Sequence, residues 1–382
     1  MSVPQDDSSA ASNPASNPAS NPAAEPAQVD PVHPCDGVPP LVELFALGGT
    51  IASLPADAGG VSPKVTGEEL VRAVPSLAEV ARVEATQFLQ LPSCEVTVGD
   101  LLLLVEVMRA AVDAGAAGCV VTQGTDTLEE TAFVLDLLWD RPAPVVVTGA
   151  MRSADQPGAD GPANLLASVR VASAPVAVGA GVLVVLGDEI HAARHVHKAH
   201  TSLPAAFVSP GLGPVGGVTE GRVWLPLRPV RRPGELSTES IGGGTPATTT
   251  TPATTPLPHV VCVRVGMGEG PQLLEAVLGM DVDGVVLEGV GGGHVPRALV
   301  PVVEQLARRV PVLLVGRPGA GPALSHSYGY PGGDVDLVAR GLLPAGALDA
   351  VKARLALVLA LAAHPSRVAA EEWLRRTFLP PA

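Results

Sequence analysis

The chain has 382 residues and a formal net charge of −14, and 47% of its residues are hydrophobic but only 3% aromatic. This length allows one large or two medium-sized domains with a core of mainly aliphatic side chains. The acidic balance argues against a nucleic-acid partner, because phosphate contacts need clustered lysine and arginine side chains. The densest basic run, RPVRRP at 228–233, is short and interrupted by proline.

The first 30 residues contain no Lys or Arg and no apolar segment of the signal-peptide type. Along the chain, no apolar run reaches the ~18 residues that a membrane-spanning helix requires, so no membrane partner is expected. The four cysteines show neither a CxxC pair nor zinc-site spacing and are predicted to be free thiols, as in a reducing compartment: Cys35, Cys94, Cys119 and Cys262. We therefore expect a cytoplasmic protein.

Two low-complexity segments divide the chain. The repeat ASNPASNPASNPAAEPAQ at 11–28 has too few apolar side chains to fold and is predicted to be disordered. The segment GGGTPATTTTPATTPLP at 242–258 is too long for a compact loop and is predicted to link two domains. The predicted organisation is a disordered tail at 1–38, an N-terminal α/β domain at 39–232, a linker at 233–257 and a C-terminal α/β domain at 258–382.

In the N-terminal part, apolar runs alternate with helical patterns. Strands are predicted at 41–49, 118–124, 144–150 and 181–188, and helices at 66–73, 99–114, 127–139 and 162–173. Thr66, and Asp160 before Gly161-Pro162, are typical residues for a helix start. Nearly continuous apolar strands that alternate with helices indicate a parallel sheet covered by helices on both faces.

The C-terminal part repeats this alternation. Strands are predicted at 258–266, 283–290 and 310–317, and helices near 270–279, 296–309 and 347–362. The predicted fold class is therefore α/β, with two domains that each contain a mainly parallel sheet of the Rossmann or flavodoxin type, preceded by the disordered tail.

Two threonines follow the ends of predicted parallel strands. The first strand ends at Gly48-Gly49-Thr50 and the second at Gly124-Thr125-Asp126. Ligands of an open parallel sheet bind beyond the carboxyl ends of its strands, so both hydroxyls and the carboxylate are expected around one crevice. The alternative is that Thr50, Thr125 and Thr127 are ordinary helix caps. That alternative is reasonable for one threonine, but the two motifs together favour a site.

The pair GGTIAS (48–53) and QGTDTLEET (123–131) resembles the two threonine signatures of the bacterial-type L-asparaginase family, the asparaginase/glutaminase family. The resemblance covers roughly residues 40 to 378. It continues, in the right order, through VVVTGAMRSADQPGADGPANL (145–165), GDEIHAARHVHKAHT (187–201), EGVGGGH (288–294) and LVGRPGAGP (314–322).

This resemblance implies an amidohydrolase that converts the small molecule L-asparagine and water to L-aspartate and ammonia, with no metal and no organic cofactor. Thr50 is expected to attack the amide carbon and form an acyl-enzyme. Thr125, Asp126 and Lys198 are expected to form the second catalytic group. Ser93, together with Thr125 and Asp126, is expected to bind the substrate. The resemblance also implies a homo-oligomer, a dimer or a tetramer, with the catalytic residues in the N-terminal domain.

The chemistry of the residues agrees with these roles. A threonine hydroxyl is a weak nucleophile at neutral pH and needs a nearby base or electric field. Lys198 is the only strong-base candidate in the motifs. Burial would favour its neutral form and Asp126 its charged form, and the sequence leaves both open. Backbone N–H groups at Gly49-Thr50 and Gly124-Thr125 are candidate oxyanion donors.

Several positions depart from the family pattern and concern substrate preference: Gln123 replaces a common histidine, Cys94 a glutamine, and Gly292 and His294 two asparagines. An amidase that prefers glutamine, or a subunit of a transamidation complex, therefore remains an alternative. The histidines of HAARHVHKAH suggest a metal-dependent hydrolase as another: His191, His195, His197 and His200. No single helix or strand presents all four to one side. A non-catalytic nucleotide-binding protein is disfavoured, because GVGGGH lacks the last glycine of a dinucleotide motif.

Overall fold

The computed structural model describes residues 38–55, 61–230, 236–241 and 256–379. Residues Pro39–Ala382 cluster as one compact unit, separate from Met1–Val38. The predicted disordered tail lies, except for Val38, outside the described residues, and so does most of the predicted linker. The division of the folded part at 233–257 therefore stays a prediction.

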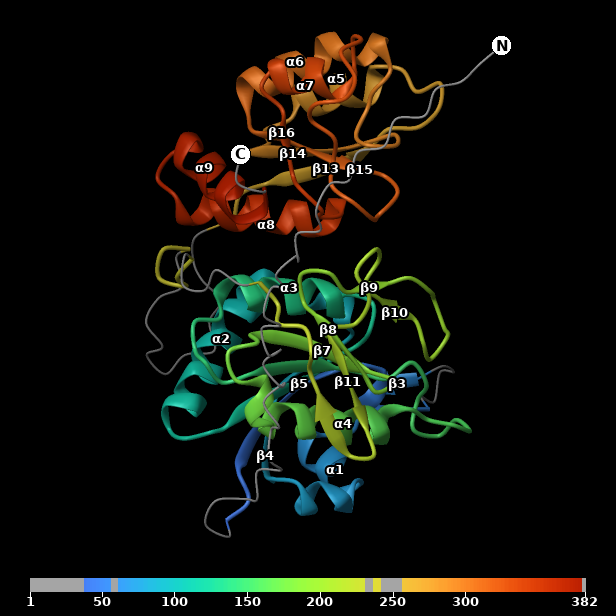
Figure 1. Ribbon diagram of the computed structural model, residues 1–382, viewed down its shortest axis with the longest axis vertical. Helices are drawn as coiled ribbons and strands as arrows, with labels where there is room; N and C mark the ends of the chain where they lie inside the picture. Colours follow the sequence, from blue (N-terminus) through green and yellow to red (C-terminus); the bar gives the residue numbers. More distant parts are fainter. Residues whose placement is uncertain (1–37, 56–60, 231–235, 242–255, 380–382) are drawn as a thin grey trace, which may run out of the picture. The chain divides into compact units, whose positions relative to one another are not determined.

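An eight-stranded sheet dominates the N-terminal half (Figure 1). Its order is β12-β11-β8-β7-β6-β5-β1-β4. The five strands from β7 to β4 pair in parallel, as predicted, whereas the pairs that link β7, β8, β11 and β12 are antiparallel. In chain order, the strands are β1 (Leu41–Gly48), β4 (Arg82–Leu91), β5 (Gly118–Thr122), β6 (Val145–Thr148), β7 (Val182–Leu186), β8 (Glu189–Ala192), β11 (Gly216–Thr219) and β12 (Arg222–Trp224).

Helices cover both faces of this sheet, as the apolar strands require. Successive side chains of a strand point to opposite faces, and in β1 Phe45 and Leu47 join one core cluster while Leu44 and Ala46 join the other. The first cluster includes side chains of α2 (Val98–Asp113) and α3 (Leu128–Leu138). The second includes side chains of α1 (Gly67–Arg72) and α4 (Gly161–Ser173). The predicted helices are thus all present.

The two predicted helix starts behave differently. Thr66 forms a capping box with Glu69, in which the Thr66 hydroxyl accepts the Glu69 N–H at 3.3 Å. Asp160 precedes α4, but its side chain does not cap that helix. Its carboxylate accepts the N–H groups of Met151 and Arg152 and the side-chain amide of Asn164 instead. Asp160 therefore ties the loop after β6 to α4.

The C-terminal half contains a four-stranded parallel sheet in the order β13-β14-β15-β16 (Figure 1). Its strands are β13 (Val260–Arg264), β14 (Gly284–Gly289), β15 (Val312–Gly316) and β16 (Leu343–Pro344). Its helices are α5 (Gln272–Gly279), α6 (Val300–Arg309), α7 (Asp334–Ala339), α8 (Ala350–Ala363) and α9 (Arg367–Phe378). Side chains of α8 share the core cluster of α2 and α3, and α8 packs against α3.

Several short elements connect these layers. They are the strand pairs β2 (Ser53–Pro55) with β3 (Val61–Pro63) and β9 (His197–Lys198) with β10 (Phe207–Val208), and the 3-10 turns η2 (Thr50–Ala52), η3 (Pro75–Glu79), η4 (Ser93–Glu95), η5 (Pro175–Ala177) and η6 (Arg297–Leu299). No helix in the described part of the chain is long and apolar enough to cross a membrane. The cysteines within the described ranges, Cys94, Cys119 and Cys262, are free thiols.

Candidate active site

Glycine backbone brings the two threonine turns together. Gly49 follows β1 with a φ of 85°, and a Cβ atom added to it would lie 2.0 Å from the Gly124 nitrogen. No real side chain tolerates such a distance, so only glycine lets the turn after β1 approach the turn after β5. Because Thr50 follows Gly49 and Thr125 follows Gly124, both threonines lie at the same carboxyl edge of the sheet.

A third segment, η4, reaches the same edge. A Cβ atom on Gly124 would lie 2.9 Å from the Ser93 hydroxyl oxygen, and Ser93 is buried. A Cβ atom on Gly48 would lie 2.6 Å from the Leu91 carbonyl oxygen, at the end of β4. The glycines at 48, 49 and 124 therefore let three loops meet, and Ser93 lies beside the Thr125 turn.

Lys198 reaches the Thr125 turn from β9. Its Nζ donates a hydrogen bond to the Thr125 hydroxyl at 2.8 Å and lies 2.6 Å from Asp126 Oδ1. The Lys198 side chain is only 13% exposed, whereas that of Asp126 is 76% exposed. The structure thus places the three residues of the predicted second catalytic group in direct contact, with an open carboxylate at the outer end.

The helix-cap interpretation is wrong for Thr50 and Thr125, and Thr127 occupies a cap position without a side-chain capping bond. The residue that caps η2 is Gly49, with no side-chain hydrogen bond, and Thr50 is the first residue of the turn. Thr127 stands at the N-cap of α3 but makes no capping bond. Its hydroxyl donates to the Ser93 carbonyl at 2.7 Å, and the Thr125 hydroxyl accepts from Lys198. These hydroxyls face neighbouring loops instead of their own helix ends.

Gln123 is a residue whose role the sequence did not reveal. Its side-chain Nε2 donates to the Thr127 hydroxyl at 3.0 Å, and that hydroxyl donates to the Ser93 carbonyl. The Gln123 side chain therefore fixes η4 against the start of α3. The only signal in the sequence was that Gln123 replaces a common histidine, and this did not indicate which groups its side chain contacts.

Glu129 is a second residue that sequence reasoning missed. It lies in the first turn of α3, is buried, and its Oε2 accepts the backbone N–H of Lys198 at 2.7 Å. The same carboxylate lies 3.0 Å from Nδ1 of His197. From the sequence alone, an acidic residue in a first helical turn is explained by the helix dipole. Here it holds the strand that carries Lys198.

The four histidines of the predicted alternative metal site have separate environments. His191 is buried, which lowers its pKa, and its Nδ1 contacts the Ser209 hydroxyl at 2.9 Å. The hydrogen bond to Glu129 raises the pKa of His197, and burial lowers that of His195. The His200 ring accepts the N–H groups of Ser202 and Leu203. In the described ranges, no three His, Cys, Asp or Glu side chains gather as metal ligands would.

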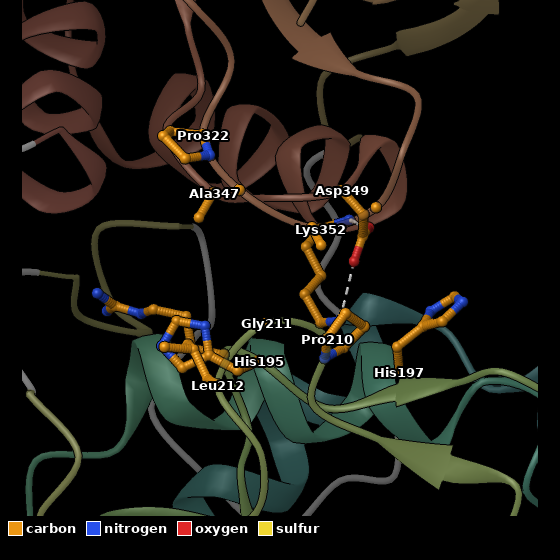
Figure 2. A pocket seen from close by; sticks show the side chains of 13 residues that line it. His195, His197, Pro210, Gly211, Leu212, Pro322, Ala347, Asp349 and Lys352 are labelled. Carbon is orange, nitrogen blue, oxygen red and sulfur yellow. Dashed lines mark hydrogen bonds and ion pairs between the residues drawn. The ribbon is translucent and has the colours of Figure 1, made fainter. Parts of the chain in front are cut away.

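A cavity of about 290 Å³ does not include this site, and Figure 2 shows the residues that line it. It is lined by the segment around His195 and His197, by the loop at 210–212, by the loop at 319–322, and by Asp349 and Lys352. None of the five candidate residues borders it. The threonine site instead opens at the exposed Asp126 carboxylate, so the chemistry is assigned from the hydrogen bonds and not from the size of a cavity.

Comparison with known proteins gives a consistent result. The family models "Asparaginase, N-terminal" and "Glutaminase/Asparaginase C-terminal domain" match residues 41–231 and 259–374. The chain belongs to the asparaginase family. It is 37% identical over 340 residues to a probable L-asparaginase of Deinococcus radiodurans, covering 89% of this chain and 97% of that protein. It is 33% identical over 325 residues to an L-asparaginase of Bacillus licheniformis, covering 85% and 96%.

The fold of this asparaginase-family member is also similar to a solved structure. The crystal structure of a probable cytoplasmic L-asparaginase from Campylobacter jejuni superimposes with a TM-score of 0.75 at 27% identity, and the match covers 88% of this chain and 99% of that one. The predicted family and fold class are therefore confirmed.

Proposed function

We propose that this chain hydrolyses the side-chain amide of L-asparagine to L-aspartate and ammonia. The observation that carries the proposal is the contact of two threonine turns, one of which holds its hydroxyl 2.8 Å from Lys198 Nζ. This arrangement offers one hydroxyl for attack and a second one coupled to a proton carrier. It occurs in a chain whose relatives are named L-asparaginase.

Thr50 is the proposed nucleophile. Its oxygen adds to the amide carbon, its proton is transferred to the departing nitrogen, and ammonia leaves an aspartyl ester on Thr50. Water then adds to the ester carbon, and the Thr50 oxygen takes back a proton as aspartate leaves. The N–H groups at Gly49-Thr50 and Gly124-Thr125 are the proposed donors to the oxyanion of both tetrahedral intermediates.

Thr125, Lys198 and Asp126 form the proposed proton-transfer group. Lys198 Nζ contacts both other members, so a proton on the Thr125 hydroxyl can be exchanged with Nζ without rearrangement. Asp126 has a second task, because its exposed carboxylate is suited to the substrate's α-ammonium group. The buried Ser93 hydroxyl, beside Gly124, is the proposed partner of the α-carboxylate.

The assembly and the compartment are also proposals. We infer a homo-oligomer, a dimer or a tetramer, because the Asp126 side chain is 76% exposed and the site is open on that side. A second chain would exclude water there and strengthen the electrostatic contacts. A cytoplasmic location agrees with the free thiols of Cys94, Cys119 and Cys262.

The deciding experiment measures ammonia and aspartate release by the purified full-length chain from L-asparagine, L-glutamine and D-asparagine. We expect release from L-asparagine in excess over the other two amides. Release mainly from L-glutamine would favour the glutaminase alternative, and release only with a partner protein would favour the transamidation subunit. Activity should survive prolonged EDTA treatment, whereas loss in EDTA and recovery with zinc would favour the metal-dependent alternative. No release from any amide would reject the proposal.

A further inference from the structure

Lys352 is a buried cation that the proposed mechanism does not use. It lies in the first turn of α8, in the C-terminal half, and only 2% of its surface is exposed. Its Nζ donates to the Val196 carbonyl at 2.6 Å. It also donates to Asp349 Oδ2 at 3.0 Å, the contact drawn in Figure 2. A buried ammonium is costly unless it is paired and hydrogen-bonded, so its retention at this position calls for a reason.

The reason lies in what surrounds the ammonium. Lys352 Nζ is 4.0 Å from Oε2 of Glu129, the same oxygen that accepts the Lys198 backbone N–H at 2.7 Å. Lys352 therefore holds the carbonyl of Val196, and Glu129 holds the N–H of Lys198. The two charged groups grip the chain on either side of His197, immediately before the side chain of Lys198 leaves for Thr125 and Asp126.

The charges alternate through this cluster. Burial raises the pKa of Asp349, but the charge of Lys352 and the hydrogen bonds that Lys352 donates outweigh it and hold this pKa below its usual range. Asp349, Lys352 and Glu129 thus follow one another as anion, cation and anion. Glu129 also lies only four residues after Thr125. Its contact with the Lys198 backbone therefore fixes Lys198 relative to the loop that carries Thr125, the hydrogen-bond partner of the Lys198 side chain.

The composition of the chain sharpens this point. Of its 24 basic residues other than histidine, 21 are arginine and three are lysine. Lys352, through its Nζ, and Lys198, through its backbone N–H, both approach Glu129. A lysine ammonium is a compact point charge, whereas the planar guanidinium of arginine is wide and forked. In a chain that uses arginine almost everywhere else, it is a lysine that donates to both the Val196 carbonyl and Asp349.

We propose that Lys352 and Glu129 are positioning residues, which clamp the backbone immediately before and after His197 in β9 and place the Lys198 side chain for proton exchange with Thr125. The inference rests on the proposed function of Lys198. It makes the C-terminal half of the same chain a contributor to the reaction. Displacement of a catalytic group by about 1 Å costs roughly 100-fold in rate, so a clamp of this kind has a measurable effect.

The kinetic test compares Lys352→Met with Arg354→Met. Arg354 lies in the same helix and also donates to a carbonyl, that of Val260, and within the described residues no hydrogen bond or ion pair joins its side chain to β9. We expect Lys352→Met and Glu129→Gln each to lower kcat by about 10- to 100-fold with KM changed by less than about threefold. Arg354→Met should keep kcat near the wild-type value. Lys352→Arg, which keeps the charge, should recover part of the loss.

Controls separate positioning from folding. If kcat per folded molecule of Lys352→Met equals that of Arg354→Met, with the folded fraction taken from circular dichroism, the clamp is refuted. If Lys352→Met does not fold, Lys352→Arg and Glu129→Gln decide. A rise in KM that exceeds the fall in kcat for these variants would also refute the clamp, because substrate binding and not the position of Lys198 would then be affected.

Hydrogen exchange tests the clamp without any assay of activity. The amides of the peptide at 196–200 should exchange faster in Lys352→Met than in the wild type, since the hydrogen bond to the Val196 carbonyl is lost and Glu129 alone holds this segment. The same peptide in Arg354→Met should exchange at the wild-type rate. Unchanged exchange in Lys352→Met refutes the clamp even if the wild-type chain releases ammonia. If the wild-type chain releases none, the proposed function fails, and the exchange result alone decides on the clamp.

Discussion

The turn that carries Thr50 and the turn that carries Thr125 have the same origin and different surroundings. Both follow buried parallel strands through glycine, and they touch at Gly49 and Gly124. The Thr125 hydroxyl is fixed by Lys198, in a residue that is 6% exposed. The Thr50 turn is fixed through its backbone, where the Gly49 carbonyl accepts the Ser53 hydroxyl at 2.8 Å and the Ala52 N–H at 3.0 Å.

This difference suggests a division of labour between two identical side chains. A hydroxyl in a permanent hydrogen bond with a lysine is suited to transferring protons. A hydroxyl held only by the geometry of its backbone can approach a substrate carbon without first breaking a strong hydrogen bond. Among the described residues, none donates a side-chain hydrogen bond to the Thr50 hydroxyl. The comparison therefore supports the proposed roles, attack by Thr50 and proton transfer by Thr125.

Removal of the Thr50 hydroxyl should have the largest effect. Thr50→Ala leaves the glycines, Ser93 and Asp126 in place, so the variant should still bind aspartate while turnover falls by at least about 10³-fold. Ammonia release and isothermal titration with aspartate measure the two effects. Near-normal turnover by Thr50→Ala would show that Thr50 is not the nucleophile. Loss of the folded circular-dichroism spectrum would mean that Thr50 has a structural task.

Thr125→Val should also abolish turnover, but at a later step. Valine has nearly the volume of threonine, so the turn should persist while the second hydroxyl is missing. Thr50 can then attack, but the ester is hydrolysed slowly, and an aspartyl adduct should accumulate on the peptide that contains Thr50. Mass spectrometry after an acid quench detects it. If the same experiment on the wild-type protein found the adduct on Thr125 instead of Thr50, the proposed roles of the two threonines would have to be exchanged.

Lys198→Met should cost about as much as Thr125→Val, because the two groups act as one unit. The double variant should then lose little more than either single variant, as is usual for catalytic groups that act together. Steady-state ammonia release by the three variants forms the cycle. Losses that multiply in the double variant would show that Lys198 and Thr125 act independently.

Much of this arrangement could be predicted from the sequence, and particular residues show why. Continuous apolar runs predicted β1, β5, β6 and β7, because a strand that is covered by helices on both faces needs apolar side chains at nearly every position. The edge strand β4 was missed, since its residues Arg82–Leu91 alternate in exposure and contain polar side chains. The antiparallel strands β8, β11 and β12 were missed for a related reason, because they are short.

The site shows the same limit. Thr50, Thr125, Asp126 and Lys198 were predicted from motifs. Glu129 was not predicted to be part of the site, because its partner Lys198 lies 69 residues later and meets it only in the folded chain. Lys352 lies farther still from Val196, at a separation of 156 residues. Contacts at such separations depend on packing between layers, which local patterns do not encode.

A more moderate change should separate the two turns without removing either hydroxyl. Gly49→Ala places a methyl group 2.0 Å from the Gly124 nitrogen and a side chain at a φ of 85°. With a ψ of −173° beside this φ, the strained backbone alone costs on the order of 1–3 kcal/mol, and the two turns have to move apart. We expect a lower melting temperature and a kcat reduced by about 100-fold. Gly115→Ala is the matched control, because Gly115 also has positive φ but no neighbour within 4 Å. Equal loss of kcat in both variants would show that strain, and not the contact of the turns, is responsible.

The smallest expected effect concerns pH and the histidines beside Lys198. The Glu129 hydrogen bond raises the pKa of His197, so His197 contributes stability below the unfolded-state pKa of about 6.5 that is lost as the pH rises through the folded-state value. The ring is 46% exposed, so solvent screening limits this contribution to at most about 1 kcal/mol. The charge of Lys352 lowers the pKa of His197 and so opposes this contribution, whereas the charge of Asp349 raises that pKa and supports it.

His195 provides the opposite sign on the same segment. Burial lowers its pKa, so the unfolded chain binds the proton more tightly, and wild-type stability falls as the pH drops through about 6.5. Urea unfolding from pH 5.5 to 8 should therefore show His197→Gln losing most stability relative to the wild type at acidic pH. The free energy of unfolding of His195→Gln should be highest, relative to the wild type, at the same acidic pH. Parallel pH profiles for the two variants would show that the Glu129 contact of His197 is not maintained in solution, and with it one of the contacts that hold β9 beside the Thr125 turn.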